Sequence, residues 1–160
     1  MMTQAAGDST PRVHWPGADV RRYRGRLYIA ETHDLPQVPG VAWDWRRKPQ
    51  IELGAGLGTL TLAEGRGAGA LARPRLPDAL EIRGDPAGAA LRPAPDARRR
   101  TLRNLFQEHG VVPWVRAHIP LLFAGKNLVA VADLWTEAKY QPRDDEPIVH
   151  IEWRGRPELY

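Results

Sequence analysis

Residues 101–131 of this 160-residue chain are TLRNLFQEHGVVPWVRAHIPLLFAGKNLVAV, a helix-like segment followed by a strand-like one. Leu102, Leu105 and Phe106 are spaced i, i+3 and i+4, so on a helix they form one apolar stripe. Gly110 follows the stripe where a glycine in the left-handed conformation commonly ends a helix. We therefore predict a short helix whose apolar face packs on neighbouring strands.

The predicted helix extends back into a run of arginines. It covers residues 98–109, with either Asp96 or Thr101 as its N-terminal cap. On such a helix Arg99 and Arg103 are four residues apart and share a face away from the apolar stripe. This face is predicted to contact phosphate groups.

A turn and a hairpin are predicted after the helix. Pro113 can open a short helical turn that reaches His118. The apolar segments 120–123 and 128–131 flank residues 124–127, which is typical of a hairpin. The predicted core positions of the whole stretch are Leu102, Leu105, Phe106, Leu121, Leu122, Val129 and Val131.

Strand patterns also occur on both sides of this stretch. Short apolar segments alternate with polar residues and are bounded by glycine and proline. A strand-rich α+β fold with one or two short helices is therefore predicted. The predicted strands are residues 18–23 paired with 26–31 across Arg24-Gly25, residues 51–53 paired with 57–63, and residues 148–153 with Val149, Ile151 and Trp153 on one face.

Basic residues are unevenly distributed along the chain. Residues 82–126 contain eight Lys or Arg and three Asp or Glu, whereas residues 127–160 contain four and seven. Residues 1–81 are close to balance, with eleven basic and nine acidic residues. A basic segment between near-neutral or acidic ones indicates a surface that faces a polyanion.

Several classes of chemistry are disfavoured by the residues present. The chain has no cysteine, and its only serine, Ser9, lies in no nucleophile motif, so a self-sufficient hydrolase is disfavoured. The five histidines lack metal-ligand spacing, and the acidic run 144–146 is predicted to be a solvated loop instead of a metal site. Gly54, Gly56 and Gly58 are predicted to form a hairpin connection and not a nucleotide loop. No apolar run approaches the roughly 18 residues of a membrane span, and a cytoplasmic location without membrane partners is expected.

Tryptophan residues could serve as core or as platforms on which bases stack. Six tryptophans are present, and Trp114 follows Pro113 beside the predicted basic helix. For Trp114 we predict packing against Phe106 in preference to stacking on nucleic acid.

The stretch 101–131 resembles the C-terminal domain of bacterial tRNA(Ile)-lysidine synthetases. That family has a basic patch, then L-K-x-L-F-Q-E-A-G-V-P-P-W-x-R, a P-L-L-Y strand and a turn into L-V-A-V. Here His109 replaces the usual alanine, Val112 replaces the first proline of the pair, and Asp133 replaces a common glycine. Residues 15–24 are also similar to the segment by which proteobacterial members leave their middle domain.

The resemblance implies a fold, an activity and partners. The fold is shared with a domain of the phenylalanyl-tRNA synthetase beta chain. The complete enzyme is a ligase that uses ATP and magnesium to join lysine to the wobble cytidine of the CAU anticodon. In the family the C-terminal domain holds the acceptor stem of tRNA(Ile), and an N-terminal domain with an S-G-G-x-D-S phosphate loop is the catalyst. That motif is not in these 160 residues, so the chain alone is expected to be inactive. We expect it to have no cofactor and no catalytic residue of its own. The N-terminal domain of the same enzyme is expected to be its partner.

The resemblance and the charge pattern together give a domain division and a set of site residues. A disordered leader is expected at residues 1–12, the end of the middle domain and a strand-rich connection at 13–78, and the tRNA-binding domain at 79–160. The alternative is a protein-interaction domain of the same fold with no RNA contact. The predicted tRNA-binding residues are Arg92, Arg98, Arg99, Arg100, Arg103, Arg116 and Lys126.

Overall fold

The computed structural model of the chain describes residues 12–15, 18–31, 35–67 and 69–160. The predicted leader lies outside these residues except for Arg12, which belongs to a strand. The strands are β1 (Arg12–Trp15), β2 (Ala18–Tyr23), β3 (Arg26–Glu31), β4 (Val41–Trp43), β5 (Gln50–Glu52), β6 (Thr59–Glu64), β7 (Ala70–Ala72), β8 (Leu80–Arg83), β9 (Ala90–Leu91), β10 (Arg100–Thr101), β11 (Leu121–Ala124), β12 (Asn127–Val131), β13 (Trp135–Thr136) and β14 (Ile148–Arg154). The helices are α1 (Leu102–Glu108) and the 3-10 turns η1 (Arg73–Arg75), η2 (Pro113–His118) and η3 (Ala138–Tyr140).

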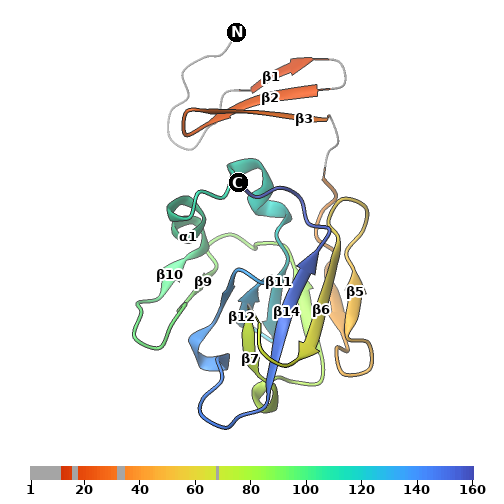
Figure 1. Cartoon of the computed structure of the whole chain (residues 1–160), viewed down its shortest axis with the longest axis vertical. Coiled ribbons are helices and arrows are strands. Elements are labelled where there is room, and N and C mark those ends of the chain that lie inside the picture. The colour runs from red at the N-terminus through yellow and green to blue at the C-terminus, as the bar shows by residue number, and fades with distance from the viewer. Residues whose placement is uncertain (1–11, 16–17, 32–34, 68) are drawn as a thin grey trace.

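Two antiparallel sheets form the body of the protein (Figure 1). One has the strand order β13-β12-β11-β8-β4 and the other β5-β6-β14-β7. Buried residues of both sheets belong to one hydrophobic core. Strands from before and after residue 79 share both sheets, since β4 pairs with β8 and β6 with β14. Because the described residues form antiparallel sheets with one short α-helix, the predicted strand-rich α+β fold class is confirmed.

The predicted core positions are all buried. Phe106 and the two leucines of the helical stripe are 2% exposed or less. The four predicted positions in β11 and β12 are 1% exposed or less. In β14 the buried and half-buried residues alternate, and Val149, Ile151 and Trp153 are the buried ones, as predicted. No helix within the described residues is long and apolar enough to cross a membrane.

The three predicted hairpins are present, and their turns follow from glycine. Arg24 and Gly25 join β2 to β3 with φ of 50° and 76°, which is the geometry of a type I′ turn. Gly125 begins the turn between β11 and β12 with φ of 61°. The predicted glycine-rich connection lies between β5 and β6, and a Cβ on Gly58 would be 1.9 Å from the Arg154 carbonyl oxygen.

The helix begins later than the predicted residue 98, and of the two predicted caps, Asp96 and Thr101, Thr101 is confirmed. α1 starts at Leu102, and its cap is Thr101, whose side-chain oxygen accepts a hydrogen bond from the Asn104 amide at 3.2 Å. The cause is a ladder with β9: Arg100 pairs with Leu91, and the Leu102 amide donates to the Ala89 carbonyl. These bonds hold residues 100–101 extended. The prediction that Arg99 and Arg103 share a helical face was therefore wrong, because Arg99 precedes the helix.

Trp114 joins the N-terminal sheet to the body. Its ring contacts Tyr28 with centroids 5.2 Å apart and Tyr23 at 6.4 Å, both edge to face. The Arg21 guanidinium lies 5.1 Å from the same ring. The predicted packing of Trp114 on Phe106 was wrong, since the aromatic neighbour of Phe106 is Trp135, at 5.6 Å. Trp114 instead packs against β2 and β3. Sequence spacing could not predict this contact, because it joins residues that are distant in the sequence.

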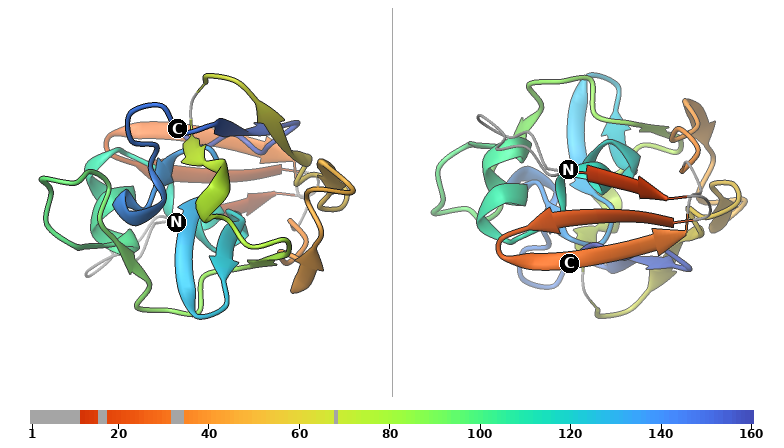
Figure 2. Two further views of the ribbon diagram at one scale, coloured as in Figure 1. Left: turned by 90° about the horizontal axis from the view of Figure 1, so that it is seen from below. Right: turned by 90° about the horizontal axis from the view of Figure 1, so that it is seen from above.

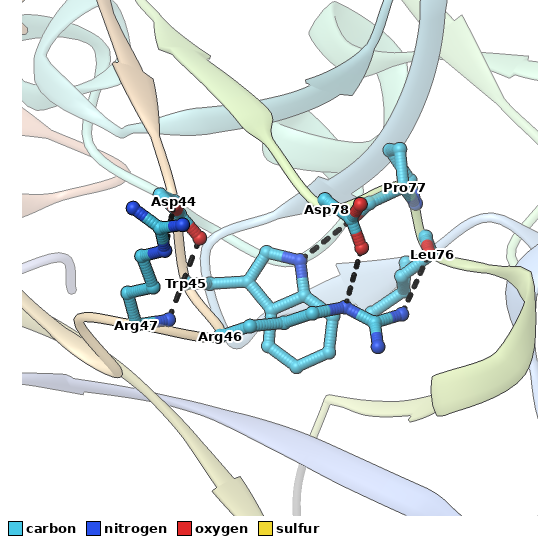
Figure 3. Close-up of polar contacts among 7 residues, drawn as sticks. All are labelled: Asp44, Trp45, Arg46, Arg47, Leu76, Pro77 and Asp78. Carbon is cyan, nitrogen blue, oxygen red and sulfur yellow. Dashed lines mark hydrogen bonds and ion pairs between the residues drawn. The ribbon is translucent and has the colours of Figure 1, made fainter.

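A second tryptophan ties the connection between β4 and β5 to the loop before β8. Figure 3 shows the Trp45 indole N–H donating to the Pro77 carbonyl, at 2.7 Å. Arg46 lies 4.9 Å from the Trp45 ring and forms an ion pair of 3.0 Å with Asp78. These contacts join the connection between β4 and β5 to the loop before β8.

Candidate nucleic-acid interface

A hollow of about 390 Å³ opens beside the loop 86–90. Arg99, Lys126 and Lys139 line it, and we call it the basic hollow. Glu137 also lines it, so its charged side chains carry a net positive charge. Anions are therefore the ligands that this hollow favours.

The turn between β11 and β12 presents Lys126 to the basic hollow. Arg83 supports this turn, because one of its N–H groups donates to the Gly125 carbonyl at 2.9 Å. The same guanidinium lies 4.3 Å from the Phe123 ring. Arg83 is thereby engaged by the fold, while the Lys126 side chain is exposed.

The loop between β9 and β10 contributes Arg99 to the lining of the hollow. Its position is fixed by η3, since the Arg92 amide donates to Glu137 Oε2 at 2.5 Å and the Ala138 amide donates to the Arg92 carbonyl at 2.8 Å. The side chains of Arg92, Arg98 and Arg99 are exposed on this loop. Within the part of the chain that the structure describes, no carboxylate pairs with any of these three guanidinium groups.

The remaining predicted arginines lie elsewhere. Arg100 forms an ion pair with Glu108, and its hydrogen bond and positive charge lower the pKa of that carboxyl, so this arginine is neutralised. Arg103 is exposed on α1. Arg116 is half-buried in the joint with the N-terminal sheet: it donates to the Val111 carbonyl at 2.9 Å and to the Tyr23 hydroxyl at 3.1 Å. The structure thus brings Arg99 and Lys126 together in the hollow and places Arg92 and Arg98 on the adjoining loop.

Lys139 lines the hollow but was missed by the sequence analysis. It lies in η3, within a part of the chain whose net charge is negative. The net charge of residues 127–160 is negative, so the charge count gave no reason to single out Lys139. The Lys139 Nζ atom lies 5.7 Å from the Tyr140 ring, a contact that only the folded structure shows.

Arginines on the other surfaces of the body are mostly paired with carboxylates. Among the described residues, Arg92, Arg98 and Arg99 at the hollow and its loop have no such carboxylate partner. The pairs are Arg46 with Asp78, Arg47 with Asp44, Arg73 with Glu64, Arg75 with Glu146, Arg154 with Glu152, and Arg156 with Asp133.

The acidic run 144–146 has a structural role in part. Glu146 accepts hydrogen bonds from the Arg75 side chain and from the Arg143 amide, while Asp144 and Asp145 are exposed. Among the described residues, no three His, Cys, Asp or Glu side chains gather as a metal site would require.

Two family models match the chain. Residues 80–153 match the TilS substrate C-terminal domain, and residues 1–28 match the TilS substrate binding domain. The first match includes the basic hollow, its loop, α1 and the stretch 101–131. Residues 80–153 are thus similar to this family of C-terminal domains.

Curated relatives name the larger protein to which such a region belongs. The tRNA(Ile)-lysidine synthase of Vibrio parahaemolyticus is 32% identical over 94% of this chain and 33% of its own length. Those of Salmonella typhi and Photobacterium profundum are 33% and 31% identical over 90% and 88% of the chain. The chain spans about a third of the length of these relatives. The predicted resemblance to the C-terminal region of proteobacterial tRNA(Ile)-lysidine synthases is confirmed.

Proposed function

We propose that this chain is the tRNA-gripping region of a tRNA(Ile)-lysidine synthase and holds the acceptor stem of tRNA(Ile). The observation that carries the proposal is the group of cations at the basic hollow and its loop, inside the segment that matches the family, that form no ion pair with a carboxylate among the described residues. Arg99, Lys126 and Lys139 line the hollow, and Arg92 and Arg98 adjoin it. We leave Arg100 and Arg116 out of the direct contacts, because their guanidinium groups are engaged within the fold.

The chemistry of the basic hollow favours an RNA backbone over stacked bases. Phe123 and Tyr140 line it but are each only 5% exposed, so neither ring offers a face on which a base could stack. An A-form stem presents phosphates and 2′-hydroxyls at its surface. The cations match the phosphates, and the Glu137 carboxylate can accept a hydrogen bond from a hydroxyl.

The reaction itself belongs, in this proposal, to a partner domain of the same enzyme. ATP and magnesium would be used there to activate the wobble cytidine, and this chain would position the tRNA. The chain alone should not join lysine to tRNA, because it contains no S-G-G-x-D-S phosphate loop. A cytoplasmic location and a fold shared with a domain of the phenylalanyl-tRNA synthetase beta chain are parts of the same proposal.

The alternative is a protein-interaction domain without RNA contact. It is favoured only by the tryptophan content, and the structure uses Trp43, Trp45 and Trp153 in the core, where each is 4% exposed or less. Trp114 is covered by the N-terminal sheet. The aromatic residues therefore give this alternative little support.

A binding titration with fragments of tRNA(Ile) tests the proposal. The chain should bind an acceptor-stem minihelix more tightly than the isolated anticodon stem-loop. Arg99→Ala with Lys126→Ala should remove most of that preference and leave the melting temperature nearly unchanged, since both side chains are exposed. Equal binding of both fragments by the unaltered chain would contradict the acceptor-stem assignment.

A further inference from the structure

The connection between β6 and β7 crosses a strand that lies between them. β6 and β7 flank β14 in the four-stranded sheet, and each is antiparallel to it. The chain therefore passes from one side of β14 to the other between Glu64 and Ala70, and we call this connection the crossover. Figure 1 shows β14 between the two strands, and in the left view of Figure 2 the yellow segment that follows β6 lies at the outside of the molecule.

His150 lies beneath the crossover, on the outer face of β14. The buried residues of this strand are Val149, Ile151 and Trp153, so the His150 side chain points away from the core. It is nevertheless only 12% exposed, because the crossover passes close to it: a Cβ on Gly67 would be 2.7 Å from the His150 ring. A glycine at this position thus lets the crossover backbone pack directly on the imidazole.

Both ring nitrogens of His150 face hydrogen-bond acceptors. Nδ1 lies 3.3 Å from the Gly65 carbonyl oxygen, and Nε2 lies 3.1 Å from Glu152 Oε1. The hydrogen bond from His150, and then the positive charge of Arg154, lower the pKa of the Glu152 carboxyl and keep it ionised. Neither acceptor therefore carries a proton to donate. Only an imidazolium, which has a proton on each nitrogen, satisfies both contacts.

A neutral His150 ring can make only one of these two hydrogen bonds. It has a single N–H, and the ionised Glu152 carboxylate is a stronger acceptor than a carbonyl oxygen. The proton therefore stays on Nε2, and the Nδ1 lone pair then faces the Gly65 carbonyl oxygen at 3.3 Å. Two acceptors at this distance repel each other, so the contact with the crossover becomes unfavourable when the ring loses its second proton.

The other charged groups on the elements next to His150 are paired elsewhere or exposed. The strand residues directly opposite it, Ala63 on β6 and Ala70 on β7, carry no charge. Arg66 on the crossover is exposed. The paired groups nearby are Glu64 with Arg73, and Asp133 with Arg156. Among the described residues, Glu152 is therefore the charged group that acts directly on the ring.

We infer that His150 is a pH-sensitive clamp, which fastens the crossover to β14 when its ring is protonated and releases the crossover when the ring is neutral. Histidine side chains commonly titrate between about pH 5 and 8. The clamp is complete on the acid side of that range and is lost as the pH rises through it. The inference goes beyond the proposed function, because His150 and the crossover do not line the basic hollow.

Release of the crossover changes a second hollow on the surface. Gly65 and Arg66 belong to the lining of this hollow, which has a volume of about 330 Å³. Two backbone hydrogen bonds still hold the crossover at its ends, from the Gly65 amide to the Ile148 carbonyl at 3.1 Å and from the Ile151 amide to the Gly69 carbonyl at 3.2 Å. We therefore expect a local loosening beside the hollow and not unfolding of the sheet.

Hydrogen exchange of the whole chain at about pH 5 and about pH 8, the ends of the range in which histidine titrates, tests the inference. Protection factors remove the intrinsic pH dependence of exchange, so they report the opening of the structure. For the Gly65 and Ile151 amides, protection should fall by about threefold to tenfold at the higher pH, the change that one net hydrogen bond supports. The amides of β11 and β12 should keep the same protection at both pH values.

Three variants test whether His150 causes the effect. His150→Gln removes the titrating group and should abolish the pH dependence. Glu152→Gln should also abolish it while keeping high protection at pH 8, because the glutamine amide can donate to Nε2 and leave the ring N–H on Nδ1 for Gly65. The matched control is His118→Gln, since His118 also contacts a backbone carbonyl, that of Pro36 at 2.9 Å. This control should leave the pH dependence of the crossover unchanged.

Equal protection of the crossover amides at both pH values in the unaltered chain would overturn the inference. So would a pH dependence that persists in His150→Gln, or one that disappears in His118→Gln. If His150→Gln does not fold, Glu152→Gln decides: a loss of protection at pH 8 as large as in the unaltered chain contradicts the clamp. The experiment measures no RNA binding, so its failure leaves the proposed function standing.

Discussion

Gly58 shows how one residue constrains the body of the protein. Its φ is +74°, and an added Cβ would be 1.9 Å from the Arg154 carbonyl oxygen, which is backbone and cannot turn aside. We predict that Gly58→Ala destabilises the fold by clearly more than the ~1–2 kcal/mol that left-handed strain alone costs. Gly125→Ala is the matched control, since its φ is +61° and nothing lies within 4 Å. Urea unfolding of both variants measures the difference, and equal losses would contradict the close approach.

Phe106 gives a second prediction at this scale. It is 2% exposed and packs against Trp135 beneath α1. Replacing it with alanine should leave a cavity and reduce the free energy of unfolding by about 3–5 kcal/mol. Asn104→Ala, at an exposed position of the same helix, should change it by less than about 0.5 kcal/mol. A thermal melt of Phe106→Ala that matches the unaltered chain would show that the helix does not pack as described.

The sequence predicted the positions of individual residues well where those residues are buried in the core. The stripe of Leu102, Leu105 and Phe106 required only helical spacing. Lys139 was not predictable in this way, because it reaches the basic hollow through the fold of η3 and not through its sequence neighbours. A site assembled from distant segments requires the tertiary structure.

At the scale of elements, the start of α1 depends on Thr101. Its hydroxyl accepts the Asn104 amide, which would otherwise lack a partner at the helix N-terminus. Thr101→Ala should cost about 1 kcal/mol, and Thr101→Ser should recover most of it. Chemical unfolding checks both values. A loss just as large for Asp96→Ala would instead favour the earlier start that the sequence suggested.

Because α1 begins at Leu102, the prediction that Arg99 and Arg103 lie on one helical face was wrong. Residues 98–100 have no strong helix breaker, so local propensity favours continuing the helix backwards. The pairing of Arg100 with Leu91 opposes this and keeps the segment extended. Hairpins, in contrast, were predicted well, because Arg24-Gly25 and Gly125 mark their turns locally. The start of α1 thus depends on pairing with a distant strand, whereas the hairpin turns depend on residues next to each other in the sequence.

At the scale of the whole molecule, the joint at Trp114 links two parts of the chain. Trp114→Ala should remove the ring contacts with Tyr23 and Tyr28 and loosen the N-terminal sheet while leaving the body folded. Hydrogen exchange should then be faster for the amides of β2 and β3 and unchanged for β11, β12 and β14. Trp114→Phe should have a smaller effect. Unchanged exchange throughout would mean that other contacts hold the sheet.

The salt dependence of tRNA binding tests the central claim most directly, namely that the cations around the basic hollow bind an RNA backbone. The logarithm of the affinity should fall steeply with the logarithm of the salt concentration, because bound phosphates release counterions. Arg99→Ala with Lys126→Ala should reduce that slope by roughly 1.4–1.8 units, about 0.7–0.9 for each lost phosphate contact. Arg47→Ala with Lys48→Ala removes the same charge elsewhere and should leave the slope unchanged. If the slope of the hollow variant equals that of the unaltered chain, the basic hollow does not bind the RNA backbone.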